Sequence, residues 1–450
     1  MTFKSLDDKI QHHGNPVKML RTAPHQHYVF PFRSEYTNWR DEQEAWAKTV
    51  VFFDQSFHMD DMYFQGPDVK RLFSDVGIND FTKFSKNKAK QFAAVTPDGN
   101  YIGDAICFGF EDDTYSVVGP PIVPDWLEYN VKRGDYDVEI TLDPRTEANP
   151  KGRRIFRFQV QGPMALEAIE HAAQGSMPSI KFFNMGEFQI AGVPVRALNH
   201  TMSGVPGLEH TGLEIMGDYA RHDDVSAAIL EAGRDFGMLV GGAAAYPSTC
   251  LESGWVALPV PGIYSGEAMK AYRQYLSADS LLAHASLGGS YYCDNIEDYY
   301  YTPWDLGVAR LVNFNHDFIG RDALQAKAKQ PHKKKVRLEW NNDDVLRAIG
   351  RSLFDQDDSR TKYFDMPLSV YTTFNVDKVM SRDTVVGRSE YTGYLTTARK
   401  FTSIALIDEE HAVDGKELTV VWGNHDNTNP ILEMHTQTEI RVTVDASAYL

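Results

Sequence analysis

The sequence predicts an α+β protein in which a duplicated α/β region, residues 1–330, precedes a smaller β-barrel-like domain, residues 331–450. At 450 residues the chain exceeds the size of one ordinary hydrophobic core, so more than one domain is expected. A strand, then Gln-Gly-Pro, then a helix occurs twice, about a hundred residues apart, which indicates an internal duplication. Beyond residue 331 alternating apolar strands with Asp-Gly turns are typical of a small β domain.

The composition of the chain argues against several classes of binding partner. The formal net charge is −17, which argues against a nucleic acid or an anionic membrane surface as partner. Cys107, Cys250 and Cys293 are widely spaced, so neither a disulfide framework nor a cysteine-based zinc site is expected. No apolar run approaches a membrane span, and the N-terminal residues lack the apolar core of a secretory signal. We therefore expect a cytoplasmic protein without nucleic-acid or membrane partners.

The first 34 residues form a Pro-containing segment that we expect to be irregular. It carries four histidines, His12, His13, His25 and His27. No acidic residue falls at a helical i+4 position to complete a compact ligand set, so a solvated surface is preferred over a metal site. Thr37 is typical of an N-cap, and residues 38–48 predict a surface helix.

A strongly apolar run, Val50 to Phe53, leads into Gln55 and His58. A histidine between Phe57 and Met59 is usually a hydrogen-bonded core residue. The same position suits a group that titrates near neutral pH inside a pocket. Both interpretations remain open at this stage.

The first copy of the repeated pattern comprises a strand at residues 62–64, the turn Gln65-Gly66-Pro67 and a helix at residues 68–76. Residues 97–100, Pro-Asp-Gly-Asn, then predict a hairpin turn. The returning strand carries Asp104 among apolar neighbours, where a carboxylate needs a polar partner. Asp104 is therefore a candidate site residue, with a structural role in the hairpin as the alternative.

The second copy comprises an alternating strand at residues 155–160, the turn Gln161-Gly162-Pro163 and a helix at residues 164–173. A strand at residues 193–198 precedes a Gly-rich stretch, residues 204–217, that contains Glu209 and Glu214. This stretch lacks the Gly-Lys-Ser/Thr and GxGxxG patterns of phosphate-binding loops. A helix capped by Asp223 or Asp224 follows and ends at Gly237.

The stretch from Gly237 to Trp255 places one large side chain, Tyr246, in a run of glycine and alanine. Small residues let a flat ligand approach the phenol closely. The alternative is a packed tyrosine whose hydroxyl is satisfied by the protein. Further on, we expect a helix at residues 267–278, a small loop at residues 288–292 that includes Ser290, and a packing role for Tyr299 to Tyr301. Strands are predicted at residues 336–340, 401–407, 418–422 and 440–444.

An ordered set of motifs resembles the glycine-cleavage T-protein (aminomethyltransferase) family of folate enzymes. These motifs are residues 53–59 (FDQSFHM), 103–104 (GD), 161–163 (QGP), 212–215 (GLEI), 302–307 (TPWDLG) and 317–321 (DFIGR). The resemblance implies a three-domain fold, with two interleaved α/β subdomains around a central folate site. Where the T-protein has an Arg-Asp-Ser-Leu-Arg segment, this chain has Tyr246 and Cys250 in place of the two arginines.

The chain is most similar to a branch of that family, the tetrahydrofolate-dependent aryl O-demethylases of the vanillate/3-O-methylgallate type. The added matches include residues 28–31, 182–185, 245–248, 251–255 and 295–300. The resemblance implies Tyr246 as the catalytic acid, with His58 tuning it, relaying its proton or holding the substrate. It also implies a set of cofactor-binding residues: Glu214, Trp255, Gln55, Asp104 and Gln161. The substrate-binding residues that we expect are Tyr28, Phe30, Pro120 and Ser290.

The implied reaction transfers the methyl group of a methoxylated aromatic to N5 of tetrahydrofolate, which gives a phenol, and needs no metal. Phe30 and Pro120 stand where vanillate-type members have Tyr and Arg, which indicates an aromatic other than vanillate. Three alternatives are an aminomethyltransferase, a sulfonium or N-methyl demethylase of the same family, and a non-catalytic folate-binding protein. The oligomeric state is not predicted from the sequence.

Overall fold

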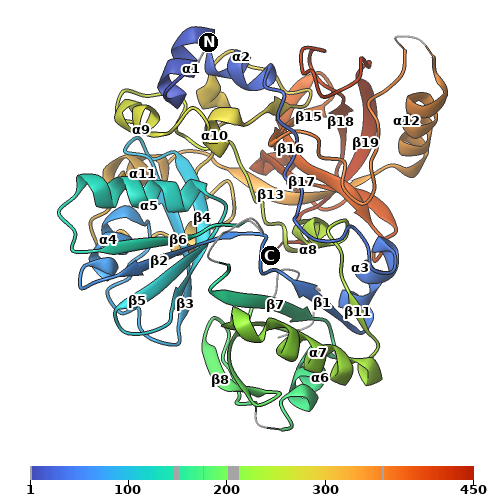
Figure 1. Cartoon of the computed structure of the whole chain (residues 1–450). Helices are drawn as coiled ribbons and strands as arrows, with labels where there is room; N and C mark the ends of the chain where they lie inside the picture. The colour runs from blue at the N-terminus through green and yellow to red at the C-terminus, as the bar shows by residue number, and fades with distance from the viewer. Residues whose placement is uncertain (1–2, 146–151, 176, 201–211, 357–358, 450) are drawn as a thin grey trace.

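The computed structural model describes residues 3–145, 152–175, 177–200, 212–356 and 359–449. Figure 1 shows three strand-rich units around a common centre: a sheet of cyan strands, a second sheet beneath it, and an orange-to-red barrel. Tyr449 returns to the centre near the end of the chain, where its hydroxyl donates to the Leu251 carbonyl (2.9 Å). The predicted α+β fold class with a barrel at its C-terminal end is confirmed.

The first sheet has five antiparallel strands in the order β3-β4-β5-β2-β6. Its elements are β2 (Asp60–Gln65), β3 (Ala89–Val95), β4 (Tyr101–Gly109), β5 (Thr114–Gly119) and β6 (Glu139–Asp143), with helices α4 (Val69–Val76) and α5 (Ile122–Arg133). The hairpin turn predicted at residues 97–100 joins β3 to β4. Phe73 on α4 and Leu127 on α5 are fully buried in the core that the helices share with this sheet.

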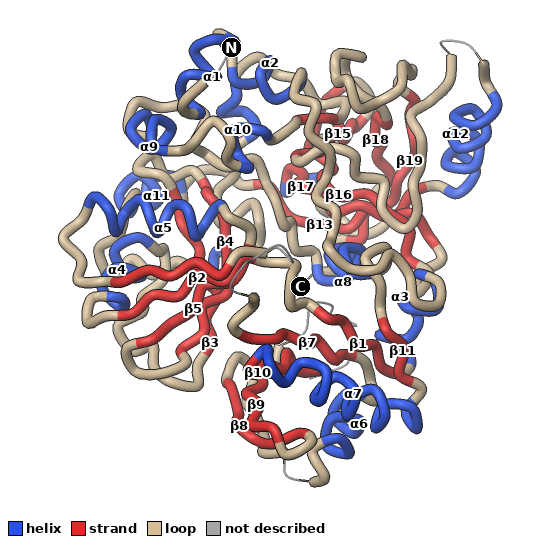
Figure 2. Tube along the Cα trace, viewed as in Figure 1, coloured by secondary structure: helices blue, strands red, loops and turns tan. Residues whose placement is uncertain are grey.

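The second sheet has six strands in the order β11-β1-β7-β10-β9-β8, and only β1 and β11 pair in parallel. Its elements are β1 (Val50–Asp54), β7 (Ile155–Gln161), β8 (Met185–Ile190), β9 (Val193–Leu198), β10 (Gly212–Asp218) and β11 (Met238–Val240), with helices α6 (Ala165–Ala172) and α7 (His222–Gly233). Figure 2 shows both helices in blue beside its red strands. The predicted stop at Gly237 is a left-handed residue (φ 69°) that separates the short 3₁₀ turn Arg234–Phe236 from β11.

The two copies of the repeated pattern have the same local geometry in different sheets. In each copy an interior strand, β2 or β7, runs through Gln-Gly-Pro into a helix, α4 or α6. The turn glycines Gly66 and Gly162 have φ angles of 137° and 133°, a conformation that side chains disfavour. This agreement supports the duplication that the sequence predicts.

The C-terminal unit is a closed six-stranded barrel in the order β13-β17-β16-β15-β18-β19. Its elements are β13 (Lys333–Trp340), β15 (Asp377–Ser381), β16 (Thr384–Leu395), β17 (Lys400–Asp408), β18 (Glu417–Trp422) and β19 (Thr438–Asp445), with helix α12 (Asn342–Phe354) beside them. The four predicted strands are confirmed, whereas β15 and β16 were not predicted because their sequences mix charged and apolar residues without a clear alternation. Trp340 and Trp422 fill the barrel core with ring centroids 5.6 Å apart.

The remaining segments join the three units. They include helices α1 (Leu6–His13), α2 (Pro16–Arg21), α3 (Trp39–Lys48), α8 (Thr249–Ser253), α9 (Lys270–Tyr275), α10 (Leu281–His284) and α11 (Arg321–Lys327). They also include the two-stranded sheet of β12 (Leu287–Gly288) and β14 (Phe374–Asn375), and short 3₁₀ turns at Tyr219–Arg221, Tyr246–Ser248, Ile296–Tyr299, Ala309–Leu311 and Glu409–His411.

The prediction of an irregular N-terminal segment was wrong for residues 6–21. Ser5 and Asp8 form a capping box that starts α1, and the side chain of Asn15 caps α2 with Pro16 in its first turn. Both signals are in the sequence, but the short helices contain few periodic apolar residues. Leu6 and Leu20 are fully buried in the large core that also holds the first sheet, so packing stabilises this segment.

Candidate active site

A cavity of about 500 Å³ lies where the N-terminal segment, the two sheets and the barrel meet. Tyr28 and Phe30 contribute from the N-terminal segment, His58 from the link between the sheets, and Tyr391 from barrel strand β16. β1 belongs to the second sheet and β2 to the first, so the short link at residues 55–59 crosses between them. This crossing explains why Gln55 and His58 reach the junction.

Tyr246 is held in the cavity wall by a tight passage of backbone. The chain leaves β11 through Gly241 and Gly242, and the Tyr246 amide donates to the Gly242 carbonyl (3.0 Å) as the 3₁₀ turn begins. The side chain is only 2% exposed. Phe30, Phe32 and Phe53 present their edges or faces to its ring at centroid distances of 5.2, 5.8 and 5.0 Å.

The Tyr246 hydroxyl joins His58 and Gln55 in one hydrogen-bonded group. Gln55 Nε2 donates to Tyr246 Oη (2.8 Å), and His58 Nε2 lies 2.9 Å from the same oxygen. His58 Nδ1 is 3.1 Å from the Gln55 carbonyl. Because a carbonyl oxygen only accepts, Nδ1 carries the imidazole hydrogen and Nε2 is the acceptor. The Tyr246 hydroxyl therefore donates its hydrogen to His58.

Burial keeps this group uncharged. Desolvation lowers the pKa of His58 to about 4, although the Gln55 carbonyl partly opposes it. Burial also raises the pKa of the Tyr246 phenol well above its usual value. At neutral pH the pair is a neutral imidazole and a neutral phenol.

Trp255 lines the cavity, and its indole nitrogen donates to both Asp104 oxygens (3.2 and 3.3 Å). Gln91 donates to the same carboxylate. Burial raises the pKa of Asp104, while the hydrogen bonds from Gln91 and Trp255 lower it. Asp104 thus has the polar partners that its position in the hairpin requires, directly behind an aromatic wall of the cavity.

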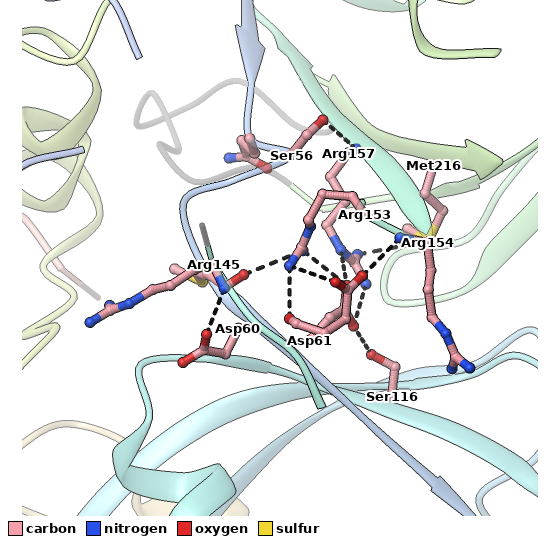
Figure 3. Close-up of polar contacts among 12 residues, drawn as sticks. Ser56, Asp60, Asp61, Ser116, Arg145, Arg153, Arg154, Arg157 and Met216 are labelled. Carbon is pink, nitrogen blue, oxygen red and sulfur yellow. Dashed lines mark hydrogen bonds and ion pairs between the residues drawn. The ribbon is translucent and has the colours of Figure 1, made fainter. Parts of the chain in front are cut away.

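Glu214 belongs to a buried ion-pair network between the two sheets. Arg157 on β7 donates to Glu214 on β10 (2.7 Å) and to Asp61 on β2 (2.9 Å). Figure 3 shows Asp61 between Arg157 and Arg153, with Ser116 hydrogen-bonded to the same carboxylate. Burial raises the pKa of Glu214, whereas the charge of Arg157 opposes that rise.

The structure does not bring every predicted site residue to the cavity. Tyr28, Phe30, Pro120, His58, Tyr246 and Trp255 line it. Ser290 does not: its hydroxyl donates to the Val421 carbonyl (2.6 Å), so its contacts are with the barrel. Gln161 is buried at the end of β7 and lies outside the cavity wall. Glu209 and most of the Gly-rich stretch lie outside the described residues.

The sequence analysis did not predict several of the residues that line the cavity. The surface location expected for the histidines was wrong for His27, whose ring nitrogens are buried and whose ring lies 6.1 Å from that of Tyr391. Burial lowers the pKa of His27 to about 4. Arg145 and Tyr391 also line the cavity. No sequence pattern marks either residue, because one follows β6 in a loop and the other lies on a barrel strand.

The described residues also bear on metal binding and on membrane insertion. No group of three or more His, Cys, Asp or Glu side chains there is arranged to hold a metal ion. Within the same part of the chain, no helix combines the length and the apolar character needed to cross a bilayer.

Comparison with known proteins identifies the class of this fold and site. The family model of the GCVT N-terminal domain matches residues 15–259, more than half of the chain. The chain therefore belongs to the GCVT family, that of the glycine-cleavage T-protein, which the sequence motifs indicated.

Two relatives and one solved structure resemble the chain over most of its length. The chain is 40% identical to syringate O-demethylase of Sphingobium sp. (strain NBRC 103272 / SYK-6), over 99% of this chain and 96% of that protein. It is 30% identical to sesamin methylene transferase of Sinomonas sp. (strain No.22), over 85% and 82% of the two chains. The crystal structure of glycine cleavage system aminomethyltransferase T from Bartonella henselae aligns with a TM-score of 0.61 at 14% identity, covering 95% of each chain.

Proposed function

We propose that this protein is a tetrahydrofolate-dependent O-demethylase, which transfers the methyl group of a methoxylated aromatic compound to N5 of tetrahydrofolate. The observation that carries the proposal is the buried Tyr246 phenol, hydrogen-bonded to neutral His58 on the wall of an aromatic-lined cavity. The 40% identity with syringate O-demethylase over nearly the whole chain supports the same reaction class. The proposal includes a cytoplasmic location, which agrees with the few, widely spaced cysteines of the chain.

The chemistry explains why a phenol is needed. An aryl ether resists cleavage because phenolate is a poor leaving group, so the ether oxygen must be protonated or strongly hydrogen-bonded as its bond to the methyl carbon breaks. Tyrosine and the phenol product have similar reference pKa values, about 10. The free-energy change of proton transfer from one to the other is therefore close to zero. Burial raises the pKa of Tyr246, and it raises that of a buried leaving phenolate for the same reason. The pKa values of Tyr246 and of the leaving phenol therefore remain similar inside the cavity.

The hydrogen bonds of Tyr246 define what each neighbour does. The Tyr246 hydrogen turns from His58 Nε2 to the ether oxygen of a bound substrate, while Gln55 continues to donate to Tyr246 Oη. This amide donor stabilises negative charge that develops on the phenol as its proton leaves. Overall, one C–O bond breaks, one C–N bond forms, and one proton moves from the acceptor nitrogen to the phenol product.

The residues around the centre fit a reduced pterin in their chemistry. Tetrahydrofolate, when bound, supplies the nitrogen that accepts the methyl group. Trp255 offers a flat aromatic wall, and Asp104 behind it offers a carboxylate. The Gln159 side-chain oxygen, opposite Glu214 in the strand register, is buried without a hydrogen-bond partner among the described residues. A ligand that donates N–H groups would satisfy such an acceptor.

An anaerobic assay tests the proposal. Purified protein is incubated with tetrahydrofolate and, separately, with vanillate, syringate, veratrate, guaiacol and a chlorinated methoxybenzoate. We expect 5-methyltetrahydrofolate and the matching phenol in equal amounts with at least one of them. Tyr246→Phe removes the proton donor and is expected to lower kcat by roughly 10²- to 10⁴-fold.

A second buried tyrosine provides the control for this variant. Tyr264 is 2% exposed and donates to the Leu282 carbonyl (2.9 Å) outside the cavity wall. Tyr264→Phe therefore removes a buried hydroxyl without touching the site, and we expect it to retain activity. Absence of product from every ether would overturn the proposal. Turnover of a sulfonium donor that survives Tyr246→Phe would do the same, because a thioether leaves without a proton.

A further inference from the structure

The cavity contains one arginine that the proposed chemistry does not use. Arg145 follows β6 and lines the cavity with Tyr28 and His58. Its backbone N–H donates to Asp60 (2.8 Å), which anchors this part of the loop to the start of β2. Its guanidinium lies over the Tyr28 ring, 4.3 Å from the centroid. A cation at such a distance is held by the face of the aromatic ring.

The guanidinium of Arg145 forms no ion pair with a described residue. In Figure 3 its side chain points away from the carboxylate of Asp61, toward which Arg153 and Arg157 converge. Arg153 and Arg157 are used inside the protein, on Asp61, Asp143 and Glu214. Arg145 therefore presents its donors to the cavity instead of to the ion-pair network.

Tyr28 connects this cation to the reacting phenol. Its hydroxyl donates to the His58 carbonyl (3.2 Å), and its ring is 5.0 Å from that of Phe30. Phe30 in turn is 5.2 Å from the ring of Tyr246. The guanidinium and the phenol thus stand along one aromatic wall, with two rings between them. A flat ligand on this wall would have its ether oxygen at one end and a substituent at the other.

We propose that Arg145 is a specificity-determining residue that binds the carboxylate of a methoxylated aromatic acid while its methoxy group faces Tyr246. A guanidinium pairs with a carboxylate through two parallel hydrogen bonds, and no other common ring substituent matches that geometry so well. This inference rests on the proposed function, and it assigns the recognition of a substrate carboxylate to Arg145.

The charges around the cavity agree with this assignment. The chain carries a formal net charge of −17, so an organic anion needs a local cation to approach it. Asp60 and Asp279 also line the cavity. Asp60 accepts the Arg145 backbone N–H, and Asp279 lies 3.6 Å from His284. Asp279 thus has a partner of its own, whereas the Arg145 guanidinium interacts with Asp60 only through their charges and forms no ion pair with a described residue.

Arg145→Met tests the inference with a pair of substrates that differ in one group. Syringate carries the carboxylate, and 2,6-dimethoxyphenol is the same compound without it. We expect the variant to lose at least tenfold in kcat/KM for syringate and less than threefold for 2,6-dimethoxyphenol, with Arg145→Lys between wild type and Arg145→Met. Equal losses for both compounds, or no loss for syringate, would overturn the assignment.

Arg154→Met is the matched control. Arg154 also anchors its backbone on a carboxylate, Asp143 (2.9 Å), and holds its guanidinium 4.8 Å from a tyrosine ring, Tyr63. It is exposed and lies outside the cavity wall, and it points away from Arg145 in Figure 3. We expect Arg154→Met to change neither substrate's kinetics by more than about twofold, as for a surface substitution.

Calorimetric binding without tetrahydrofolate separates this inference from the proposed function. We expect syringate to bind wild-type protein at least tenfold more tightly than Arg145→Met. If no ether is demethylated but this difference is found, the proposed function fails and the carboxylate site stands. If ethers are demethylated and the difference is absent, the function stands and the Arg145 assignment fails.

Discussion

At the scale of single residues, the site depends on how one histidine is held. His58 is buried, its Nδ1 hydrogen is committed to the Gln55 carbonyl, and its Nε2 accepts from Tyr246. A protonated His58 would carry a hydrogen on Nε2 as well. It could then no longer accept the hydrogen bond that Tyr246 donates. The site therefore requires the neutral imidazole, which burial supplies by lowering the pKa.

A histidine titration tests this prediction. Because desolvation lowers the pKa of His58 to about 4, its ring should remain neutral from pH 8 down to pH 5. His222 is the internal control, because hydrogen bonds to Asp54 and Asp223 raise its pKa. In NMR spectra of protein with ¹⁵N-labelled histidine, we expect the His222 signals to titrate above the ordinary histidine value of about 6.5 and the His58 signals to stay constant from pH 8 to pH 5. Signals are assigned with His58→Asn and His222→Asn, and titration of His58 near its ordinary value would contradict the prediction.

The lowered pKa of His58 also determines the direction in which the stability of the folded protein changes with pH. The unfolded chain binds a proton on His58 near pH 6.5, whereas the folded protein binds it only near pH 4. The unfolded state therefore binds more protons between these values, and this histidine's contribution to stability falls as the pH drops from 6.5 toward 4. His27 and His200 have pKa values lowered to about 4 by burial and act in the same direction.

At the scale of elements, the passage from β11 to the Tyr246 turn depends on Gly242. A Cβ atom added there would lie 2.1 Å from the Ser34 carbonyl oxygen. The Ala244 amide donates to that same oxygen (2.9 Å), so the N-terminal segment and the Tyr246 segment are in backbone contact. This contact keeps Phe30 and Phe32 against the phenol ring.

Gly242→Ala is expected to lower both the melting temperature and kcat, because Ser34 must move and carry the aromatic wall with it. Gly350→Ala is the control: Gly350 lies in helix α12, and its added Cβ would meet nothing within 4 Å. We expect this control to keep full activity and to gain roughly 0.5–1 kcal/mol of stability from helix propensity. Calorimetric melting and the methyl-transfer assay measure both effects, and an unchanged Gly242→Ala variant would contradict the argument.

At the scale of the whole molecule, Arg157 holds the two sheets together. It bridges Asp61 in the first sheet and Glu214 in the second, and its side chain is only 2% exposed. Its removal leaves Glu214 buried without its cation and leaves Asp61 with only the more distant Arg153 (3.8 Å). Such a loss costs about 3–5 kcal/mol, whereas an exposed ion pair contributes about 0–1 kcal/mol.

Arg157→Met is therefore expected to lower the free energy of unfolding by about 3–5 kcal/mol in urea. Arg221→Met breaks the exposed pair with Asp224 and should cost less than about 1 kcal/mol. Comparable losses in the two variants would show that the network does not hold the sheets together. Raising the salt concentration should weaken the exposed pair and leave the buried one almost unchanged.

Local sequence patterns predicted much of the architecture. The Gln-Gly-Pro turns, the hairpin at residues 97–100 and the stop at Gly237 are short-range signals, because each depends on the backbone preferences of a few adjacent residues. The barrel strands at residues 336–340 and 440–444 were visible because alternation reports one buried face. Strand β16 has charged residues among its buried ones, Arg388 and Glu390, and gave no such signal.

The sequence by itself determined the fold class, the internal repeat and the two residues, Tyr246 and His58, on which the proposed chemistry depends. All of these rest on local patterns or on ordered motifs, which linear spacing preserves. Only the tertiary structure decided that Tyr246 donates to His58, that Ser290 contacts the barrel, and that Arg145 faces the cavity. These facts depend on segments far apart in the chain, such as residues 58 and 246, which meet only when the two sheets and the barrel close around one centre.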